Sequence, residues 1–227
     1  MKSNLEQIWH RIRAAAVASG RAPEAVRLVA VSKTHPVERI REAAVAGVTD
    51  LGENYVQEAR EKIEALSGSP LRWHFIGHLQ SNKAKTAVTL FEWIHTVDSV
   101  KLAREINRHA AGLGKVQKIL IQVNTGMEDT KSGIPAGDLS GLVTEIGRLA
   151  NVSVRGLMAI PPYFDDPEAV RPHFKRLREL RDAIREQEIP NVLMEELSMG
   201  MSGDFEAAIS EGATMVRIGT AIFGERK

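Results

Sequence analysis

Two parts of the sequence carry residue types that could hold a phosphorylated aldehyde or ketone. Lys33 closely follows an apolar run at 28–31 and offers an amine that can form an imine with a carbonyl carbon. Near the other end of the chain, segments 197–203 and 217–221 are rich in glycine, serine and threonine. Backbone N–H groups and hydroxyls of this kind bind phosphate. Together the two parts predict a ligand bound covalently at one end and through its phosphate at the other.

Both features also have simpler explanations. A lysine at a strand end often extends its ammonium group into solvent. Glycine, serine and threonine are ordinary turn residues, and Ser202 could simply cap a helix. The phosphate interpretation is favoured because the two segments follow the last two expected strands, where parallel barrels commonly bind phosphate.

Short apolar segments typical of buried strands alternate with amphipathic helical segments along the whole chain. The expected strands are 28–31, 49–52, 73–77, 93–97, 119–123, 152–160, 192–198 and 214–219. Helices are expected between them, including 54–66, 139–149, 168–188 and 204–211. About eight such units close a parallel barrel. The sequence therefore predicts an α/β fold, a single (β/α)8 TIM barrel over residues 1–227.

An extra helix is expected before the first strand, with an apolar face formed by Leu5, Ile8, Trp9 and Ile12 and an end at Gly20. Ser3 and Glu6 have the spacing of a capping box, and Asp98 is placed to cap the helix after the fourth strand. An open doubly wound sheet that binds a dinucleotide would need a glycine-rich turn after an early strand. The first turn, 32–36, contains no glycine, so the barrel is favoured.

Composition argues against several other classes of function. Lys and Arg number 30 against 29 Asp and Glu, a formal net charge of +1, so no nucleic-acid partner is expected. Cysteine is absent, which rules out disulfides, thiolate nucleophiles and cysteine-bound metals. No signal peptide and no membrane-spanning apolar stretch are found, so a cytoplasmic protein without a membrane partner is expected. His74 and His78 could face one side of a strand, but no third ligand lies near and no metal site is assigned.

Seven segments together resemble one known family. They are 30–34 (Ala-Val-Ser-Lys-Thr), 52–58, 73–83, 131–133, 156–161, 197–202 and 216–220. They closely resemble the pyridoxal phosphate homeostasis protein family, and the resemblance covers essentially the whole chain. The run Trp-His-Phe-Ile-Gly-His at 73–78 is highly specific, and no motif position departs from the family pattern.

The resemblance implies a barrel similar to the N-terminal domain of alanine racemase that binds pyridoxal 5′-phosphate (PLP). It implies that Lys33 forms the Schiff base with PLP. The remaining implied contacts are Ser198, Ser202, Gly219 and Thr220 around the phosphate, Arg217 near the ring or phosphate, Asn54, His78 and Met199 in the pocket lining, and Lys131 as a second lysine on a loop. It also implies a protein that buffers PLP or delivers it to PLP-dependent apoenzymes, without established turnover. A monomer is expected.

Simple chemistry agrees that no catalytic residue should be assigned. PLP catalysis usually relies on a protonated pyridine nitrogen, which the permanent charge of Arg217 would disfavour. Racemisation also needs a base on each face of the substrate, and no further domain is expected after the last strand to supply one. The alternatives are a small PLP-dependent racemase or lyase, or a Schiff-base aldolase with Glu53 and His78 as acid and base. A partner-binding scaffold has little support.

Overall fold

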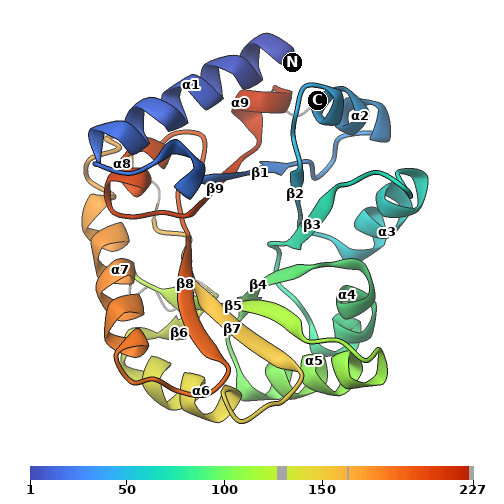
Figure 1. Cartoon of the computed structure of the whole chain (residues 1–227), viewed down its shortest axis with the longest axis vertical. Coiled ribbons are helices and arrows are strands. Elements are labelled where there is room, and N and C mark those ends of the chain that lie inside the picture. The colour runs from blue at the N-terminus through green and yellow to red at the C-terminus, as the bar shows by residue number, and fades with distance from the viewer. Residues whose placement is uncertain (127–131, 163, 225–227) are drawn as a thin grey trace.

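Eight parallel strands form a closed barrel in the computed structural model, which describes residues 1–126, 132–162 and 164–224. The barrel strands are β1 (Arg27–Val31), β2 (Asp50–Glu53), β3 (Arg72–Phe75), β4 (Trp93–Val97), β5 (Gln117–Asn124), β7 (Val152–Met158), β8 (Val192–Ser198) and β9 (Met215–Ile218). They pair in the order β4-β3-β2-β1-β9-β8-β7-β5, and β5 closes the ring on β4 (Figure 1). The predicted (β/α)8 barrel is therefore confirmed.

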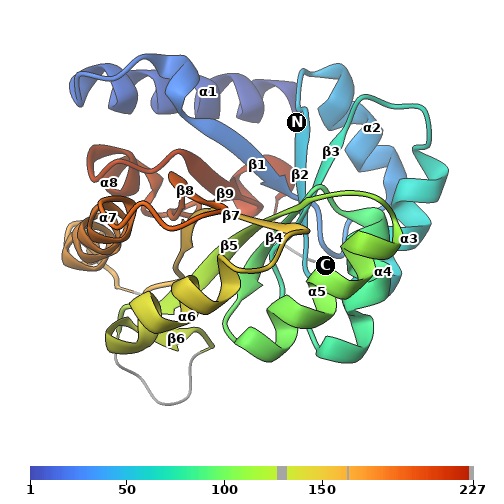
Figure 2. The ribbon, with the colours of Figure 1, turned by 60° about the horizontal axis from the view of Figure 1, so that its bottom comes forward.

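Helices surround the barrel (Figures 1 and 2). They are α2 (Val37–Val45), α3 (Val56–Ala65), α4 (Ala84–Leu90), α5 (Val100–Gly112), α6 (Leu139–Ile146), α7 (Arg171–Arg185), α8 (Phe205–Ser210) and α9 (Thr220–Phe223), with short 3-10 turns at Pro23–Ala25, Ser81–Lys83 and Ala136–Asp138. A two-residue strand, β6 (Ile134–Pro135), pairs with β5 outside the barrel. Neither β6 nor α9 was expected from the sequence. Within the described ranges, no helix combines the length and the apolar character needed to cross a bilayer.

The predicted N-terminal helix is present as α1 (Lys2–Ala18), which lies along α8 and α9 (Figure 1). Its buried face consists of Leu5, Ile8, Ile12 and Ala16. The predicted capping box is wrong: the N-cap is Met1, and no side chain caps the helix. Because the helix already begins at Lys2, Ser3 lies inside the first turn, where it cannot act as the N-cap.

The predicted cap at Asp98 is also wrong, by one residue. Ser99 is the N-cap of α5, and its Oγ accepts a hydrogen bond of 3.3 Å from the backbone N–H of Leu102. After β4 ends at Val97, the chain stays extended through Ser99 before helical geometry starts at Val100. A serine hydroxyl at that position satisfies one of the free N–H groups of the first turn.

The apolar core has two parts. Most buried apolar side chains lie between the barrel and its helices, as expected for parallel strands covered by amphipathic helices. A separate cluster comprises Val29, Trp93, Leu120, Met158 and Met215. These residues come from five different barrel strands, which places the cluster inside the barrel.

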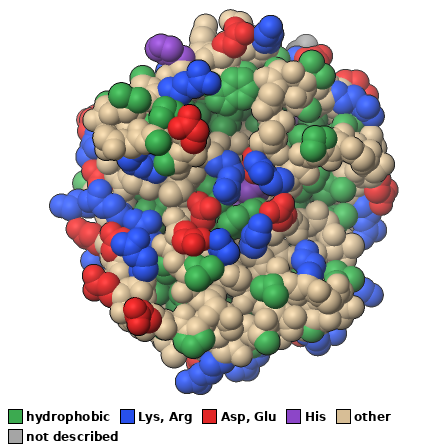
Figure 3. All heavy atoms as spheres, viewed as in Figure 1, with side chains coloured by type: hydrophobic (Ala, Val, Ile, Leu, Met, Phe, Trp, Pro, Cys, Tyr) green, Lys and Arg blue, Asp and Glu red, His purple; other side chains and the backbone are tan. Residues whose placement is uncertain are grey.

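The N-terminal ends of the strands are crowded with ion pairs. Arg72 Nη2 lies 2.6 Å from Asp50 Oδ2, and Lys118 Nζ lies 2.6 Å from Glu92 Oε1. Figure 3 views this face and shows Lys, Arg, Asp and Glu side chains gathered at its centre. The opposite, C-terminal end of the barrel carries the cavity described next.

Candidate functional site

The C-terminal ends of β1, β7, β8 and β9, with the loops that follow them, surround a cavity of about 520 Å³. Its lining consists of Val31, Lys33, Ile160, Pro161, Pro162, Phe164, Asp165, Pro167, Val170, Met201, Ser202, Gly203, Asp204, Arg217, Gly219 and Thr220. The volume falls within the usual range for small-molecule and cofactor sites, roughly 300–1,000 Å³. The cavity brings together five predicted site residues: Lys33, Ser202, Arg217, Gly219 and Thr220.

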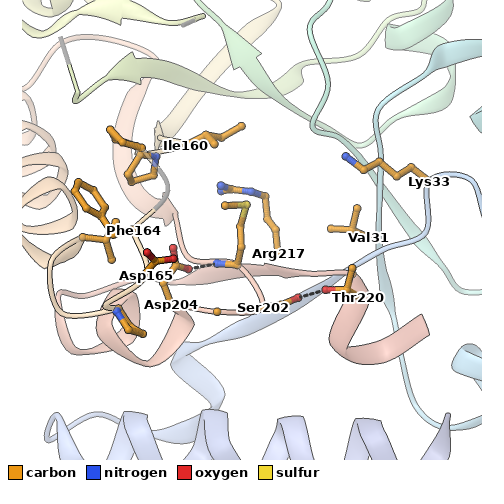
Figure 4. Close-up of a pocket in the computed structure, with 16 residues that line it drawn as sticks. Val31, Lys33, Ile160, Phe164, Asp165, Ser202, Asp204, Arg217 and Thr220 are labelled. Carbon is orange, nitrogen blue, oxygen red and sulfur yellow. Dashed lines mark hydrogen bonds between the residues drawn. The ribbon is translucent and has the colours of Figure 1, made fainter. Parts of the chain in front are cut away.

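Lys33 stands two residues beyond the end of β1 and is half-buried. Its side chain extends from the strand end, and its amino group points into the cavity toward the side where Arg217 lies (Figure 4). This position favours a role in the cavity over a lysine that simply extends into bulk solvent. An amine at the wall of a cavity can act as a nucleophile toward a carbonyl group.

A buried ionic cluster holds the backbone on both sides of Lys33. The ammonium of Lys62, on α3, donates to the backbone oxygen of Ser32 at 2.7 Å, to Glu53 Oε1 at 2.7 Å and to Glu58 Oε1 at 2.6 Å. Ser32 Oγ also donates to Glu53 Oε1 at 2.6 Å. We call Glu53, Glu58 and Lys62 the ionic clamp.

The clamp also fixes the residue after Lys33. Glu58 Oε1 accepts a hydrogen bond from the backbone N–H of Thr34, which has a φ of 67°. Burial raises the pKa of Glu53, and the hydrogen bonds from Lys62 and Ser32 oppose that change. Glu53 therefore serves the clamp and does not line the cavity, which removes it as an acid or base partner of Lys33.

The guanidinium of Arg217, on β9, lines the cavity although the residue is only 4 % exposed. Arg217 Nη1 donates to Ser198 Oγ at 2.7 Å, and Nη2 donates to the backbone oxygen of Ala159 at 2.9 Å. Burial lowers the pKa of Arg217 to about 10, and the charge of Asp204 acts in the opposite direction. The side chain therefore remains a cation at neutral pH and offers fixed donors to an anionic or acceptor group.

The loops after β8 and β9 face each other across one side of the cavity. The hydroxyl of Thr220 donates to Ser202 Oγ at 3.2 Å, a hydrogen bond drawn as a dashed line in Figure 4. Gly200 has a φ of +93°, and a Cβ there would lie 2.7 Å from that of Ala208, so this turn needs glycine. With Gly219 beside them, these hydroxyls and backbone N–H groups have the chemistry of a phosphate site.

Ser198 and Met199 lie beneath the cavity and do not line it. Both are fully buried. Ser198 Oγ lies 3.0 Å from His95 Nδ1 and accepts the hydrogen bond from Arg217, while the backbone N–H of Met199 donates to Met215. The sequence analysis did not single out His95, whose only signal was its place inside a buried strand.

Asn54 and His78 lie outside this cavity as well. Asn54 follows β2 and packs against Gly77. A Cβ added to Gly77 would lie only 2.2 Å from the backbone oxygen of Asn54. His78 is exposed and lines a separate polar groove with Asp98 and Lys101. The strand order explains this separation, because β3 is two strands from β1 on the side away from β9. Lys131 lies outside the described residues.

Sequence analysis missed one wall of the cavity. It is formed by Ile160, Pro161, Pro162, Phe164, Asp165, Met201 and Asp204. Ile160, Phe164 and Met201 are 42 %, 37 % and 38 % exposed, so this wall ends in an apolar rim. Burial raises the pKa of Asp204, while the backbone N–H of Met201 and the charge of Arg217 oppose the change. Met201 lies within the predicted phosphate segment 197–203, and Ile160 and Pro161 lie within the family-like segment 156–161, but neither pattern indicated an apolar wall.

The fold and site define a class of protein: a barrel of the alanine racemase N-terminal domain family, whose model matches residues 3–227. A pyridoxal phosphate homeostasis protein from Aquifex aeolicus is 48 % identical over 223 residues, which cover 98 % of this chain and 97 % of that protein. Its Escherichia coli K12 counterpart is 44 % identical and covers 98 % and 95 %. This chain belongs to the pyridoxal phosphate homeostasis protein family.

Solved structures agree with this assignment. The structure of PipY from Synechococcus elongatus with PLP bound is 40 % identical, with a TM-score of 0.84, and the match covers 94 % of this chain and all of PipY. Alanine racemase from Clostridium difficile is 18 % identical with a TM-score of 0.74, and the match covers 99 % of this chain and 57 % of that enzyme. The second likeness concerns the fold alone.

Proposed function

We propose that this protein binds PLP in the cavity at the C-terminal end of its barrel and takes part in intracellular PLP homeostasis. The observation that carries the proposal is that the cavity places a strand-end lysine, a buried arginine and two glycine- and hydroxyl-rich loops around one space. The relatives named for PLP homeostasis and the PLP-bound PipY structure support it.

The groups around the cavity fit such a ligand. Lys33 supplies the amine, which would condense with the aldehyde of PLP with loss of one water molecule. Ser202, Gly219 and Thr220 would surround the phosphate with hydroxyls and backbone N–H groups. Arg217 would supply a fixed positive charge and donors that cannot act as a base.

Storage and delivery suit this site better than catalysis. A cation that is retained near the cofactor opposes a protonated ring nitrogen, on which PLP chemistry usually depends. The exposed apolar rim leaves the cavity open to an incoming amine, whereas enzymes normally close such sites against water. We infer that PLP-dependent apoenzymes, through their own lysines, are the acceptors.

The binding proposal is tested with purified protein. Titration with PLP should produce a visible absorption band, and pyridoxal without the phosphate should bind much more weakly. Borohydride reduction followed by peptide mapping should place the adduct on Lys33, and Lys33→Ala should abolish it. An adduct mapped to Lys131, or equal affinity for PLP and pyridoxal, would refute the assigned site.

Delivery is tested separately. Loaded protein is mixed with a PLP-dependent apoenzyme in the presence of a trap that consumes free PLP, and recovery of the acceptor's activity is followed. Direct delivery predicts that recovery persists with the trap present. Loss of recovery would leave binding intact and remove the carrier role.

A further inference from the structure

A chain of hydrogen bonds crosses the inside of the barrel from its N-terminal end to the cavity. Asp50 Oδ1 lies 3.0 Å from His74 Nε2, and His74 Nδ1 lies 2.9 Å from His95 Nε2. His95 Nδ1 lies 3.0 Å from Ser198 Oγ, which accepts the bond from Arg217. All five residues are at most 4 % exposed. We call Asp50, His74, His95 and Ser198 the histidine chain.

The Asp50 end sets the direction of the bonds when both rings are neutral. An ionised carboxylate only accepts, so His74 donates from Nε2 to Asp50. A neutral His74 then accepts at Nδ1 from His95 Nε2, and a neutral His95 accepts at Nδ1 from the Ser198 hydroxyl. The Ser198 oxygen keeps a lone pair that accepts from Arg217.

Burial favours the neutral form of both rings. It lowers the pKa of His95 well below its ordinary value, and the charges of His74, Arg217 and Arg27 act in the same direction. Burial also lowers the pKa of His74, although the hydrogen bond and charge of Asp50 oppose it. Both histidines are therefore taken as neutral inside the barrel.

The far end of the chain is anchored on the N-terminal face. Arg72 donates to Asp50 from Nε at 2.9 Å and from Nη2 at 2.6 Å. Burial acts to raise the pKa of Asp50, but hydrogen bonds from His74, Arg72 and Thr49 outweigh it and hold the pKa well below its usual range. The carboxylate therefore stays a charged, fixed acceptor.

Such a chain is costly if it serves packing alone. Buried polar networks give little net stability compared with apolar side chains of similar volume, and apolar residues already form a cluster inside the same barrel. The chain ends on Arg217, a buried cation that lines the cavity. Its position therefore points to a role in the site.

We propose that the histidine chain is a positioning device for Arg217. By directing the Ser198 hydroxyl toward His95, it keeps the Ser198 oxygen free to accept from Arg217 Nη1, and Ala159 holds Nη2. Two fixed acceptors orient the guanidinium plane and leave its remaining donors for the ligand. The inference rests on the proposed function and gives Ser198 a role through Arg217 rather than on the phosphate itself.

The test is a double-mutant cycle between His95 and Arg217, read by PLP affinity and by the visible absorption band of bound PLP. His95→Leu removes the acceptor of Ser198 and should weaken PLP binding about five- to tenfold, as expected for one misplaced hydrogen bond, and shift the band. Arg217→Met should weaken binding more. Added to Arg217→Met, His95→Leu should cause no further change.

Two further variants make the test decisive. His95→Asn keeps an acceptor oxygen near the Nδ1 position and should restore most of the affinity and the original band. Ser198→Ala removes a single oxygen. If His95→Leu does not fold, Ser198→Ala and Arg217→Met form a second double-mutant cycle that tests the same contact. The inference would be overturned if His95→Leu lowered PLP affinity equally in the unaltered protein and in Arg217→Met. It would also be overturned if His95→Leu lowered the melting temperature but left the band and the affinity unchanged. If the unaltered protein fails to bind PLP, the proposed function fails instead.

Discussion

The two strand ends that carry Lys33 and Arg217 are held in opposite ways. At the end of β1, the ionic clamp surrounds the backbone of Ser32 and Thr34 with two carboxylates and an ammonium. At the end of β9, Arg217 itself is held by two neutral oxygens, and the charge that anchors its partners lies at the far end of the barrel. At the first end the clamp holds the main chain on both sides of the lysine, and at the second end the two oxygens hold the arginine side chain.

This difference follows from what each residue has to do. Lys33 has to present its amine to a carbonyl carbon, so a fixed main chain on both sides positions the base of its side chain. Arg217 never changes its charge, so orientation alone matters, and neutral acceptors orient it without cancelling that charge. Removing one charge should therefore have different consequences at the two ends.

The largest expected effect is the loss of the ammonium from the clamp. Lys62→Met leaves Glu53 buried without a cation, and the free energy of unfolding should fall by about 3–5 kcal/mol, measured by urea denaturation. The adduct at Lys33 should also form more slowly. The matched control is Lys118→Met, which breaks a half-exposed pair with Glu92 and should cost less than about 1 kcal/mol.

Glu53→Gln in the Lys62→Met background should recover part of the stability, because it removes the uncompensated carboxylate. If Lys62→Met lowers the free energy of unfolding no more than Lys118→Met does, the clamp does not hold the end of β1 as argued.

At the other end, loss of the buried cation should affect binding far more than folding. Arg217→Met removes a desolvated charge, which is favourable, and loses the hydrogen bonds to Ser198 and Ala159, which is unfavourable. The free energy of unfolding should therefore change by no more than about 1 kcal/mol, because the two effects oppose each other. PLP affinity should fall by more than about tenfold. A loss of stability as large as that of Lys62→Met would contradict the distinction between the two ends.

The neutral chain at the β9 end also predicts a pH dependence. The unfolded chain protonates His95 near its ordinary pKa of 6.5, whereas the folded chain keeps it neutral to a much lower pH. The folded pKa is depressed, so the stability is fully present above about pH 6.5 and is lost as the pH falls, by up to about 1.4 kcal/mol per pH unit. His95→Leu should therefore flatten the decline in unfolding free energy between pH 6.5 and 5.

Urea denaturation at three pH values measures this slope. His10→Gln, a change on the exposed surface of α1, is the control and should leave the slope unaltered. An unchanged slope in His95→Leu would show that His95 takes up its proton equally in the folded and unfolded chains.

Much of the site could be predicted because strand ends in a parallel barrel meet at one rim. The apolar runs before Lys33 and Arg217 identified two such ends, and β1 and β9 are neighbours in the barrel. Their loops were therefore bound to converge, with Ser202, Gly219 and Thr220 beside them.

The differences from the expected lining have equally physical causes. A strand-end position does not tell which side of an eight-stranded rim a residue faces, and His78 lines a different groove from this cavity, so its contact with PLP stays a prediction. Ile160 was expected in a strand but lies beyond the end of β7, and Phe164 and Met201 lie in loops, so their place on the wall depends on loop geometry. The histidine chain could not be predicted, because the hydrogen-bond partner of each buried imidazole lies on another strand and comes into contact with it only when the barrel closes.

The smallest expected effect concerns backbone strain, which is found at the β1 end of this comparison. Thr34, three residues beyond β1, adopts a φ of 67°, whereas Gly219, directly after β9, has a φ of −116°. A left-handed conformation costs a residue with a Cβ about 1 kcal/mol. Thr34 adopts it as the third residue of a turn in which the backbone N–H of His35 donates to the oxygen of Ser32, and Glu58 accepts from the N–H of Thr34. Thr34→Gly should therefore be more stable than Thr34→Ala by about 1 kcal/mol, the reverse of the usual order.

The same pair of substitutions at Ser67, an exposed turn residue without a positive φ, gives the reference order, with alanine favoured. Urea denaturation of the four variants measures both differences. If alanine is favoured at Thr34 as well, the turn at 32–35 positions Lys33 without backbone strain. If glycine is favoured, this turn holds strain directly after Lys33, and the hydrogen bonds of the turn and of the clamp offset its cost.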